Sequence, residues 1–204
     1  MSIYLFHHQK VEQFFADKYE RLSIEIEKID IANIEDINQR ANQIADKYKI
    51  AVPTINKGGI TSVLNLEDLN GHVYQENPYA SYPKPDIVAT ATVTVPITGN
   101  EDCFGLIPQV YSQNTIPALV SKGSLKFKIR TSYVRLDLTD TWKDFIRNKS
   151  VEAVEFIETN LKNLAIDFDK FNTRLLSDIV QALEERQNDW NKRNEINKEI
   201  NPFK

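Results

Sequence analysis

The 204-residue chain has few of the residues that build covalently or metal-stapled folds: one cysteine, three histidines, one methionine and six glycines. Cys103 has no partner for an internal disulfide, which favours a reducing compartment, and we expect a cytoplasmic protein. Long hydrophobic runs are missing as well. A membrane span needs about 20 apolar residues, and threonines interrupt the longest weakly polar stretch, residues 87–97. We therefore expect neither a membrane segment nor secretion.

An excess of basic residues is also absent. The chain carries 25 Lys and Arg against 29 Asp and Glu, a formal net charge of −4. General nucleic-acid binders gain affinity by neutralising phosphates and usually show a basic excess. The composition therefore disfavours that class unless the basic residues gather in a local patch. With 41% hydrophobic and 26% charged residues, the chain is typical of a globular protein with a sizeable core.

Recognisable catalytic motifs are missing from the sequence. There is no HxH, HExxH or CxxC spacing and no GxxxxGK[ST] or GxGxxG loop, so we expect no metal site and no cofactor. Cys103 and His72 could form a thiol hydrolase, but the acidic residues before the thiol oppose thiolate formation. Asp167 and Asp169 would point about 200° apart on a helix and could not share a metal ion. A hydrolase of unknown class is therefore our third choice of function.

The first segment of the chain, residues 1–49, has helical periodicity. Its apolar residues recur at spacings of three, four and seven, which forms one stripe of a helix: Val11, Phe14, Phe15, Leu22, Ile26 and Ile29. A break follows, where Asn33 and Asp36 resemble a capping box. A second helix should run from there to about Tyr48. Two helices joined by so short a link predict a helical hairpin or a bent arm.

Residues 50–138 have the character of a β-domain. Proline, Gly-Gly and Asn-Gly punctuate its first half, and residues 87–97 then alternate between apolar residues and threonine, which predicts a strand. The pattern predicts further strands, at 60–66, 72–75, 109–113, 116–120 and 124–131. The last two should be joined by a turn at Ser121-Lys122-Gly123. This segment therefore predicts a small antiparallel sheet or sandwich.

Residues 139–204 return to helical periodicity. Apolar residues follow the 3-4 spacing of coiled-coil a and d positions, and we call them the seam: Val154, Ile157, Leu161, Leu164, Phe168 and Phe171. The register breaks at Asp178, which predicts a second helix capped by Asn172, and the polar residues after Gln187 should fray. Strands segregated from helices classify the fold as α+β, with long C-terminal helices forming a bundle or coiled coil.

Two surfaces are candidates for function. The seam needs a partner helix, which the same chain or another copy could supply; a second copy would make the protein a self-associating scaffold, sensor or regulatory subunit that binds a partner protein. The alternative is a basic strand face. Lys126, Lys128 and Arg130 alternate with apolar residues, so a strand sends all three to one side, with Lys122 close by. Such a face suits a nucleotide, a nucleic acid or an acidic partner, or simply protects an edge strand.

One segment, VTVPITGNEDCFGLIP, resembles a pattern of small uncharacterised bacterial proteins: hydrophobic-Pro-[Phe/Ile]-x-Gly-[Asp/Asn], then Phe, then Pro. The matching residues are Pro96, Gly99, Asn100, Phe104 and Pro108, with ALEERQ-like residues at 182–187 near the end of the chain. In that family, too, a helical N-terminus precedes strands and long helices follow. The resemblance implies the same order of elements and an association with bacterial defence genes, but it implies no activity.

Overall fold

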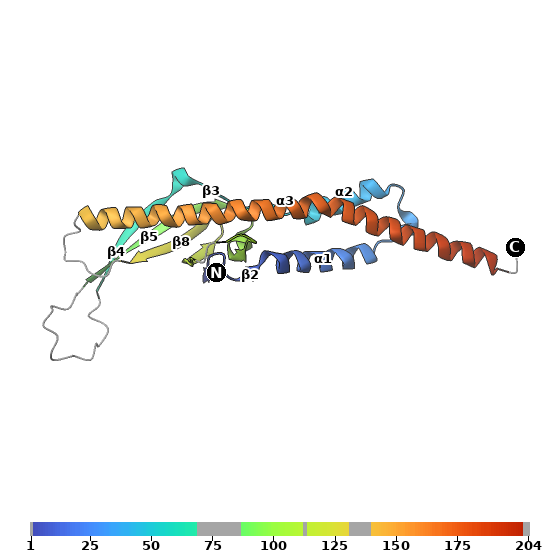
Figure 1. Ribbon diagram of the computed structural model, residues 1–204, viewed down its shortest axis with the longest axis horizontal. Coiled ribbons are helices and arrows are strands. Elements are labelled where there is room, and N and C mark those ends of the chain that lie inside the picture. Colours follow the sequence, from blue (N-terminus) through green and yellow to red (C-terminus); the bar gives the residue numbers. More distant parts are fainter. Residues whose placement is uncertain (1, 69–86, 112–113, 131–139, 202–204) are drawn as a thin grey trace, which may run out of the picture.

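The computed structural model describes residues 2–68, 87–111, 114–130 and 140–201, and the fold is α+β (Figure 1). The strands are β1 (Ser2–Tyr4), β2 (Gln9–Lys10), β3 (Thr54–Ile55), β4 (Thr61–Asp68), β5 (Ile87–Thr98), β6 (Leu106–Ile107), β7 (Pro117–Ser121) and β8 (Ser124–Arg130). The helices are α1 (Val11–Glu27), α2 (Ile37–Tyr48), α3 (Asp140–Glu199) and the short 3-10 turns η1 (Ile31–Asn33), η2 (Lys57–Gly59) and η4 (Glu101–Gly105).

An antiparallel sheet forms one end of the elongated molecule (Figure 1). Its order is β1-β7-β8-β5, and both β3 and β4 pair with the far edge of β5. The alternation predicted for β5 is confirmed, because Val93 and Val95 are buried while Thr92 and Thr94 are partly exposed. The predicted turn between β7 and β8 is confirmed as well, with Gly123 at a φ of 77° that favours glycine.

The helix α3 spans the whole length of the molecule. Its 60 residues correspond to about 90 Å of helix. The first part of α3 covers one face of the sheet, where Phe156 packs edge-on against Phe6, 5.8 Å away between ring centroids. Along the second part, α1 and α2 both pack against α3 (Figure 1), and they contact each other through the ion pair of Lys47 with Glu25 at 2.6 Å. Buried residues from the helices and from the sheet join in one hydrophobic cluster.

The prediction of two C-terminal helices is wrong, because α3 is a single helix. After Phe171 the buried residues are Leu175, Ile179 and Leu183, so the spacing changes from 3-4 to four. This shift moves the stripe by one position and leaves Asp178 outside it, where its carboxylate accepts a 2.7 Å hydrogen bond from the hydroxyl of Tyr19. A change in spacing within one helix therefore explains the apparent break.

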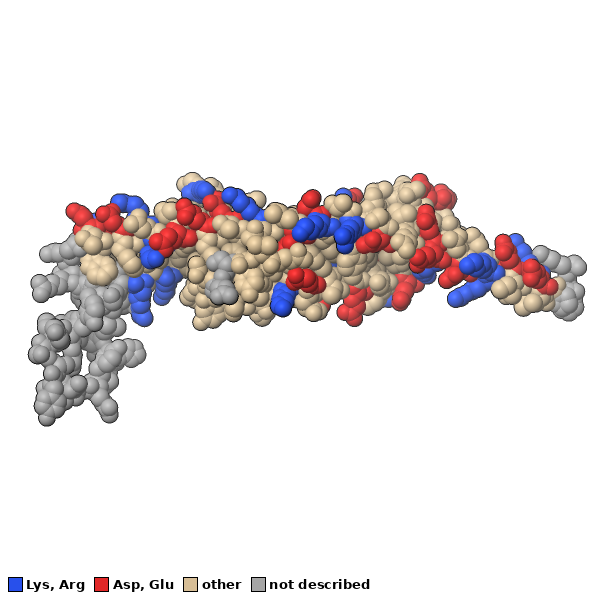
Figure 2. Space-filling view, in the orientation of Figure 1, with Lys and Arg blue, Asp and Glu red and all other residues tan. Residues whose placement is uncertain are grey.

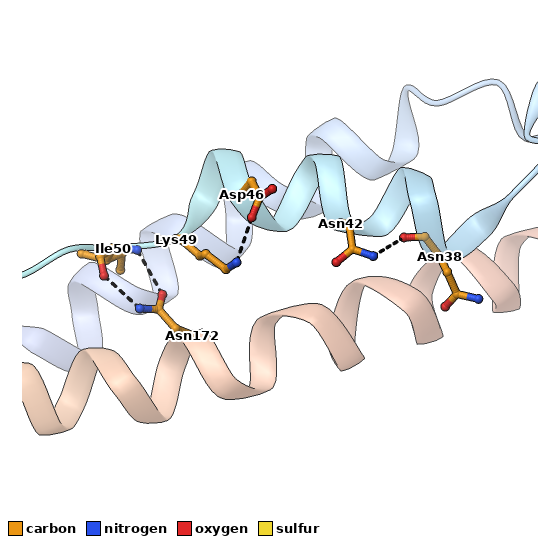
Figure 3. Close-up of polar contacts among 6 residues, drawn as sticks. All are labelled: Asn38, Asn42, Asp46, Lys49, Ile50 and Asn172. Atoms are coloured by element: carbon orange, nitrogen blue, oxygen red, sulfur yellow. Dashed lines mark hydrogen bonds and ion pairs between the residues drawn. The ribbon is translucent and has the colours of Figure 1, made fainter.

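Asn172 does not cap a helix; it joins two elements. Its side-chain amide donates to the carbonyl of Ile50 at 2.9 Å and accepts from the N–H of Ile50 at 3.0 Å (Figure 3). Ile50 follows the end of α2 and is only 8% exposed. A buried segment that leaves a helix must satisfy its backbone groups elsewhere, and Asn172 satisfies both groups of this residue.

Three further predictions from the sequence are wrong, and a fourth concerns residues that the structure does not describe. The capping residue of α2 is Asp36 and not Asn33, because the Asp36 carboxylate accepts from the N–H groups of Asn38 and Gln39. Residues 109–111 form no strand: the N–H of Gln109 donates to Asp167 of α3 instead. The polar end of the chain is helical as far as Glu199. The strand predicted at 72–75 lies outside the described residues.

Candidate functional site

The seam residues lie in the interior of this chain. Five of the six seam residues are buried and the sixth, Val154, is partly buried against the same cluster; the buried ones are Ile157, Leu161, Leu164, Phe168 and Phe171. Aromatic rings of α1 supply part of the cover. Phe15 stacks on Phe171 with 4.8 Å between ring centroids, and Phe14 stacks on Phe168 at 6.3 Å. The sequence left open whether the same chain or another copy covers the seam. In this structure the same chain covers it, through α1.

The outer face of the sheet, on the side away from α3, is the candidate interface. In β8, Leu125 and Phe127 are buried while Lys126 and Lys128 are exposed. The antiparallel register places Thr94 beside Lys126, Thr92 beside Lys128 and Thr90 beside Arg130. The predicted basic row is therefore present, and a row of threonines lies next to it on β5.

Apolar side chains border this row on both sides. Leu119 of β7 lies opposite Lys126 and is 47% exposed, and Tyr4 of β1 is 59% exposed. On the other side, Val63 of β4 lies opposite Thr92 and is 58% exposed. We define the outer face by these residues together with the basic row. Figure 2 shows Lys and Arg side chains on the lower side of the sheet end of the molecule.

The outer face has recognisable limits. Lys122 lies in the turn between β7 and β8, beyond one end of the row, where the carboxylate of Glu101 accepts from the N–H of Gly123 at 3.2 Å. At the other end, Thr90 is buried. Lys126, Lys128 and Arg130 are themselves exposed.

The thiol chemistry weighed from the sequence has no accessible nucleophile. Cys103 lies in η4 and is completely buried. Burial in the first place, and the charge of Asp102 in the second, raise the pKa of the Cys103 thiol to about 11. The thiol is thus protonated at neutral pH and shielded from solvent, whereas a nucleophilic cysteine needs a lowered pKa and access. His72, its expected partner, lies outside the described residues.

The acidic residues considered for hydrolysis have structural partners. Asp167 is buried in α3 and accepts from the backbone N–H of Gln109 at 2.9 Å. Glu158 of α3 pairs with Lys57 of η2 at 2.8 Å. Both carboxylates tie loops to α3. Within the described ranges, no three His, Cys, Asp or Glu residues come together as a metal site would require.

Comparisons with known proteins add no family. No family model, no curated protein and no solved structure matches this chain. None of the helices in the described part of the chain has the length and apolarity needed to cross a bilayer.

Some residues of the outer face were not singled out from the sequence. Tyr4, Val63 and Leu119 come from three different strands, and only the pairing of those strands brings them beside the basic row. The threonine face of β5 was visible as an alternation. The sequence did not show that this alternation and the one in β8 lie next to each other in register.

Proposed function

We propose that the protein is a non-enzymatic scaffold that binds an acidic segment of a partner protein on the outer face of its sheet. The observation that carries this proposal is the row of Lys126, Lys128 and Arg130 on a sheet face that none of the described helices covers. Among the outer-face residues whose side chains are described, none is acidic. A local row of one sign attracts a segment of the opposite sign, even in a protein with a net charge of −4.

The apolar borders favour a polypeptide over a nucleic acid. Leu119 and Val63 supply exposed apolar surface on both sides of the row, and the buried core of a protein interface is more apolar than the rest of the surface. Proteins that bind single-stranded nucleic acids combine a positively charged groove with several aromatic rings on which successive bases stack. Tyr4 is the one exposed aromatic side chain on the described part of this face, so it offers a single stacking platform.

The rest of the molecule suits a scaffold. The long helix α3 carries the sheet at one end and projects beyond α1 at the other (Figure 1). Near the end of α1, the Arg186 guanidinium of α3 donates a hydrogen bond to the carbonyl of Ile26. A continuous helix is stiff over this length, so a partner held at the sheet would stand at a fixed distance from the projecting end. Self-association through the seam would require α1 to leave Phe168 and Phe171.

The buried, protonated thiol of Cys103 supports a non-enzymatic role, and the single cysteine supports a cytoplasmic location. The resemblance to bacterial proteins that accompany defence genes would place such a scaffold in a defence system. These two parts of the proposal concern cellular context and are tested by localisation and by deletion of the gene during phage challenge.

The binding test uses defined probes. Fluorescein-labelled peptides with glutamate at alternate positions and leucine or valine between them match the spacing of β8, and labelled dT15 and U15 represent nucleic acids. We expect the peptides to bind the wild-type chain and to bind at least tenfold more weakly to the double variant Lys126→Glu/Lys128→Glu. The matched control, Lys192→Glu/Arg193→Glu, makes the same change in net charge on the exposed end of α3 and should bind as the wild type does.

The competing outcomes are distinct. Tight binding of the oligonucleotides would overturn the assignment of a protein partner, and its logarithmic salt dependence would have a slope of about −2 for three cations on a single strand. If neither class of probe binds, or if the control variant loses binding as strongly as the β8 variant, the outer face is not the interface. Circular dichroism of each variant checks that the fold is retained.

A further inference from the structure

A cleft of about 400 Å³ lies where α1 meets the sheet, away from the outer face. Its floor is apolar and comes from four elements: Ile3 of β1, Phe14 of α1, Leu106 of β6 and Val120 of β7. Leu106 and Val120 are buried, whereas Ile3 and Phe14 are partly exposed. A volume of this order accommodates a small organic molecule.

The two walls of the cleft carry opposite charges. Lys18 and Arg21, three residues apart on α1, line one wall, and Glu101 and Asp102 of η4 line the other. Lys18 extends over the ring of Phe14, with its Nζ 5.6 Å from the ring centroid. Within the described residues, neither Lys18 nor Arg21 forms an ion pair, and neither does Asp102. The cleft therefore separates charges of opposite sign that would otherwise be expected to pair.

Neighbouring groups keep these charges available. Asp17, next to Lys18, also lines the cleft, and its carboxylate accepts from Gln9 at 2.9 Å and from Gln13 at 2.8 Å. These neutral amides hold the carboxylate in place, and because Lys18 and Arg21 lie on the same wall, that wall keeps a net positive charge. Lys18 and Asp102 both act on the buried thiol of Cys103, and they shift its pKa in opposite directions. Both charges therefore act on the same buried thiol, and both residues line the cleft.

We propose that this cleft binds a small zwitterion with a branched apolar body, that is, an aliphatic amino acid. Its carboxylate would meet Lys18 and Arg21, its ammonium group would meet Asp102 and Glu101, and its side chain would lie on the floor. A simple anion would leave the acidic wall without a partner, and the acidic wall would repel it. A simple amine would leave the basic wall without a partner, and the basic wall would repel it. Only a molecule that carries both charges satisfies both walls.

The segment that resembles the bacterial pattern builds one wall of this cleft. Gly99 has a φ of +102°, and an added Cβ there would lie 3.0 Å from the backbone of Pro53. Asn100 then accepts from the N–H of Asp102 at 3.1 Å and begins the turn η4. The residues of the pattern thus hold Glu101 and Asp102 at the mouth of the cleft, while Phe104 is buried behind them.

The test compares three molecules that share one apolar body: L-leucine, 4-methylpentanoate, which lacks the ammonium group, and 3-methylbutylamine, which lacks the carboxylate. Binding to the full chain is followed by isothermal titration calorimetry and by amide shifts in ¹⁵N-HSQC spectra. We expect L-leucine to bind at least tenfold more tightly than either of the others and to shift the amides of residues 14–21 and 100–106.

Variants assign each charge to its wall. Lys18→Met/Arg21→Gln should weaken L-leucine at least tenfold and leave 3-methylbutylamine unchanged, whereas Asp102→Asn should weaken L-leucine and leave 4-methylpentanoate unchanged. Lys192→Met/Arg193→Gln removes two cations far along α3 and should have no effect. Equal affinity for L-leucine and 4-methylpentanoate would overturn the zwitterion assignment. No shift with any of the three, in a folded protein, would overturn the site.

Discussion

The contact between Asn172 and Ile50 gives the sharpest test of how α2 is fixed to α3. The variant Asn172→Ala leaves one N–H and one C=O of Ile50 without their partner. A buried polar group that loses its hydrogen bond costs about 1–3 kcal/mol, and water reaches this residue only in part because Ile50 is 8% exposed. We expect a loss of about 3 kcal/mol in the free energy of unfolding, or about 6–12 °C in melting temperature for a chain of this size.

A second asparagine of α3 provides the matched control. Asn163 donates to the carbonyl of Val110 at 2.7 Å, but Val110 is 72% exposed, so water replaces the lost donor. Asn163→Ala should therefore cost less than about 1 kcal/mol. Both variants make the same gain in helix propensity, which the comparison cancels. Urea unfolding at equal m-values measures the difference, and equal losses in the two variants would refute the reasoning.

Three further predictions concern the core and its ionisable groups. Leu164→Ala should cost about 2–5 kcal/mol because the side chain is fully buried in the chain; a variant that keeps its melting temperature while its mass by light scattering falls would instead show an intermolecular seam. Burial first, and the hydrogen bond to Asp178 second, raise the pKa of Tyr19 from 10.0 to about 12, so its contribution to stability is complete below pH 10 and is lost between about pH 10 and 12. The variant Tyr19→Phe should lack this pH dependence, which is measured as the difference between the free energies of unfolding of the wild type and the variant at each pH. Cys103 should react with Ellman's reagent only in urea, and rapid reaction of the native chain would contradict its burial.

The sequence predicted the class of the fold because period and spacing dominate that choice. The alternation in β5 and the helical stripe beginning at Val11 both appear where expected. The break at Asp178 was misread because a strict heptad was assumed, while a helix packed first against a sheet and then against helices follows no single repeat. Asn172 was misread for a different reason: asparagine caps helices through its own backbone neighbours, whereas here it binds a residue that is distant in sequence.

The candidate sites were harder to predict because each draws on several segments. The basic row could be derived from the alternation of β8 alone, since all its members lie on one strand. The cleft could not be predicted in this way, because Lys18 and Asp102 are distant in sequence and line one cleft only in the folded chain. The spacing of the charged residues of α1 does not distinguish Lys18 and Arg21 from an ordinary solvated helix face. Only the acidic residues on the opposite wall of the cleft mark these two cations as part of a candidate site.

The two proposed sites use opposite faces of the same two strands. Successive residues of a strand point to opposite sides of a sheet, so Ile3 lines the cleft while Tyr4 lies on the outer face, and Val120 lines the cleft while Leu119 lies on the outer face. An amino acid in the cleft and a peptide on the outer face would therefore not collide. Each can be titrated in the presence of the other, and loss of one by mutation of its own residues should leave the other intact. Any change in peptide affinity caused by L-leucine must be matched by an equal change in the affinity for L-leucine caused by the peptide. Those paired titrations would measure how strongly β1 and β7 connect the two sites.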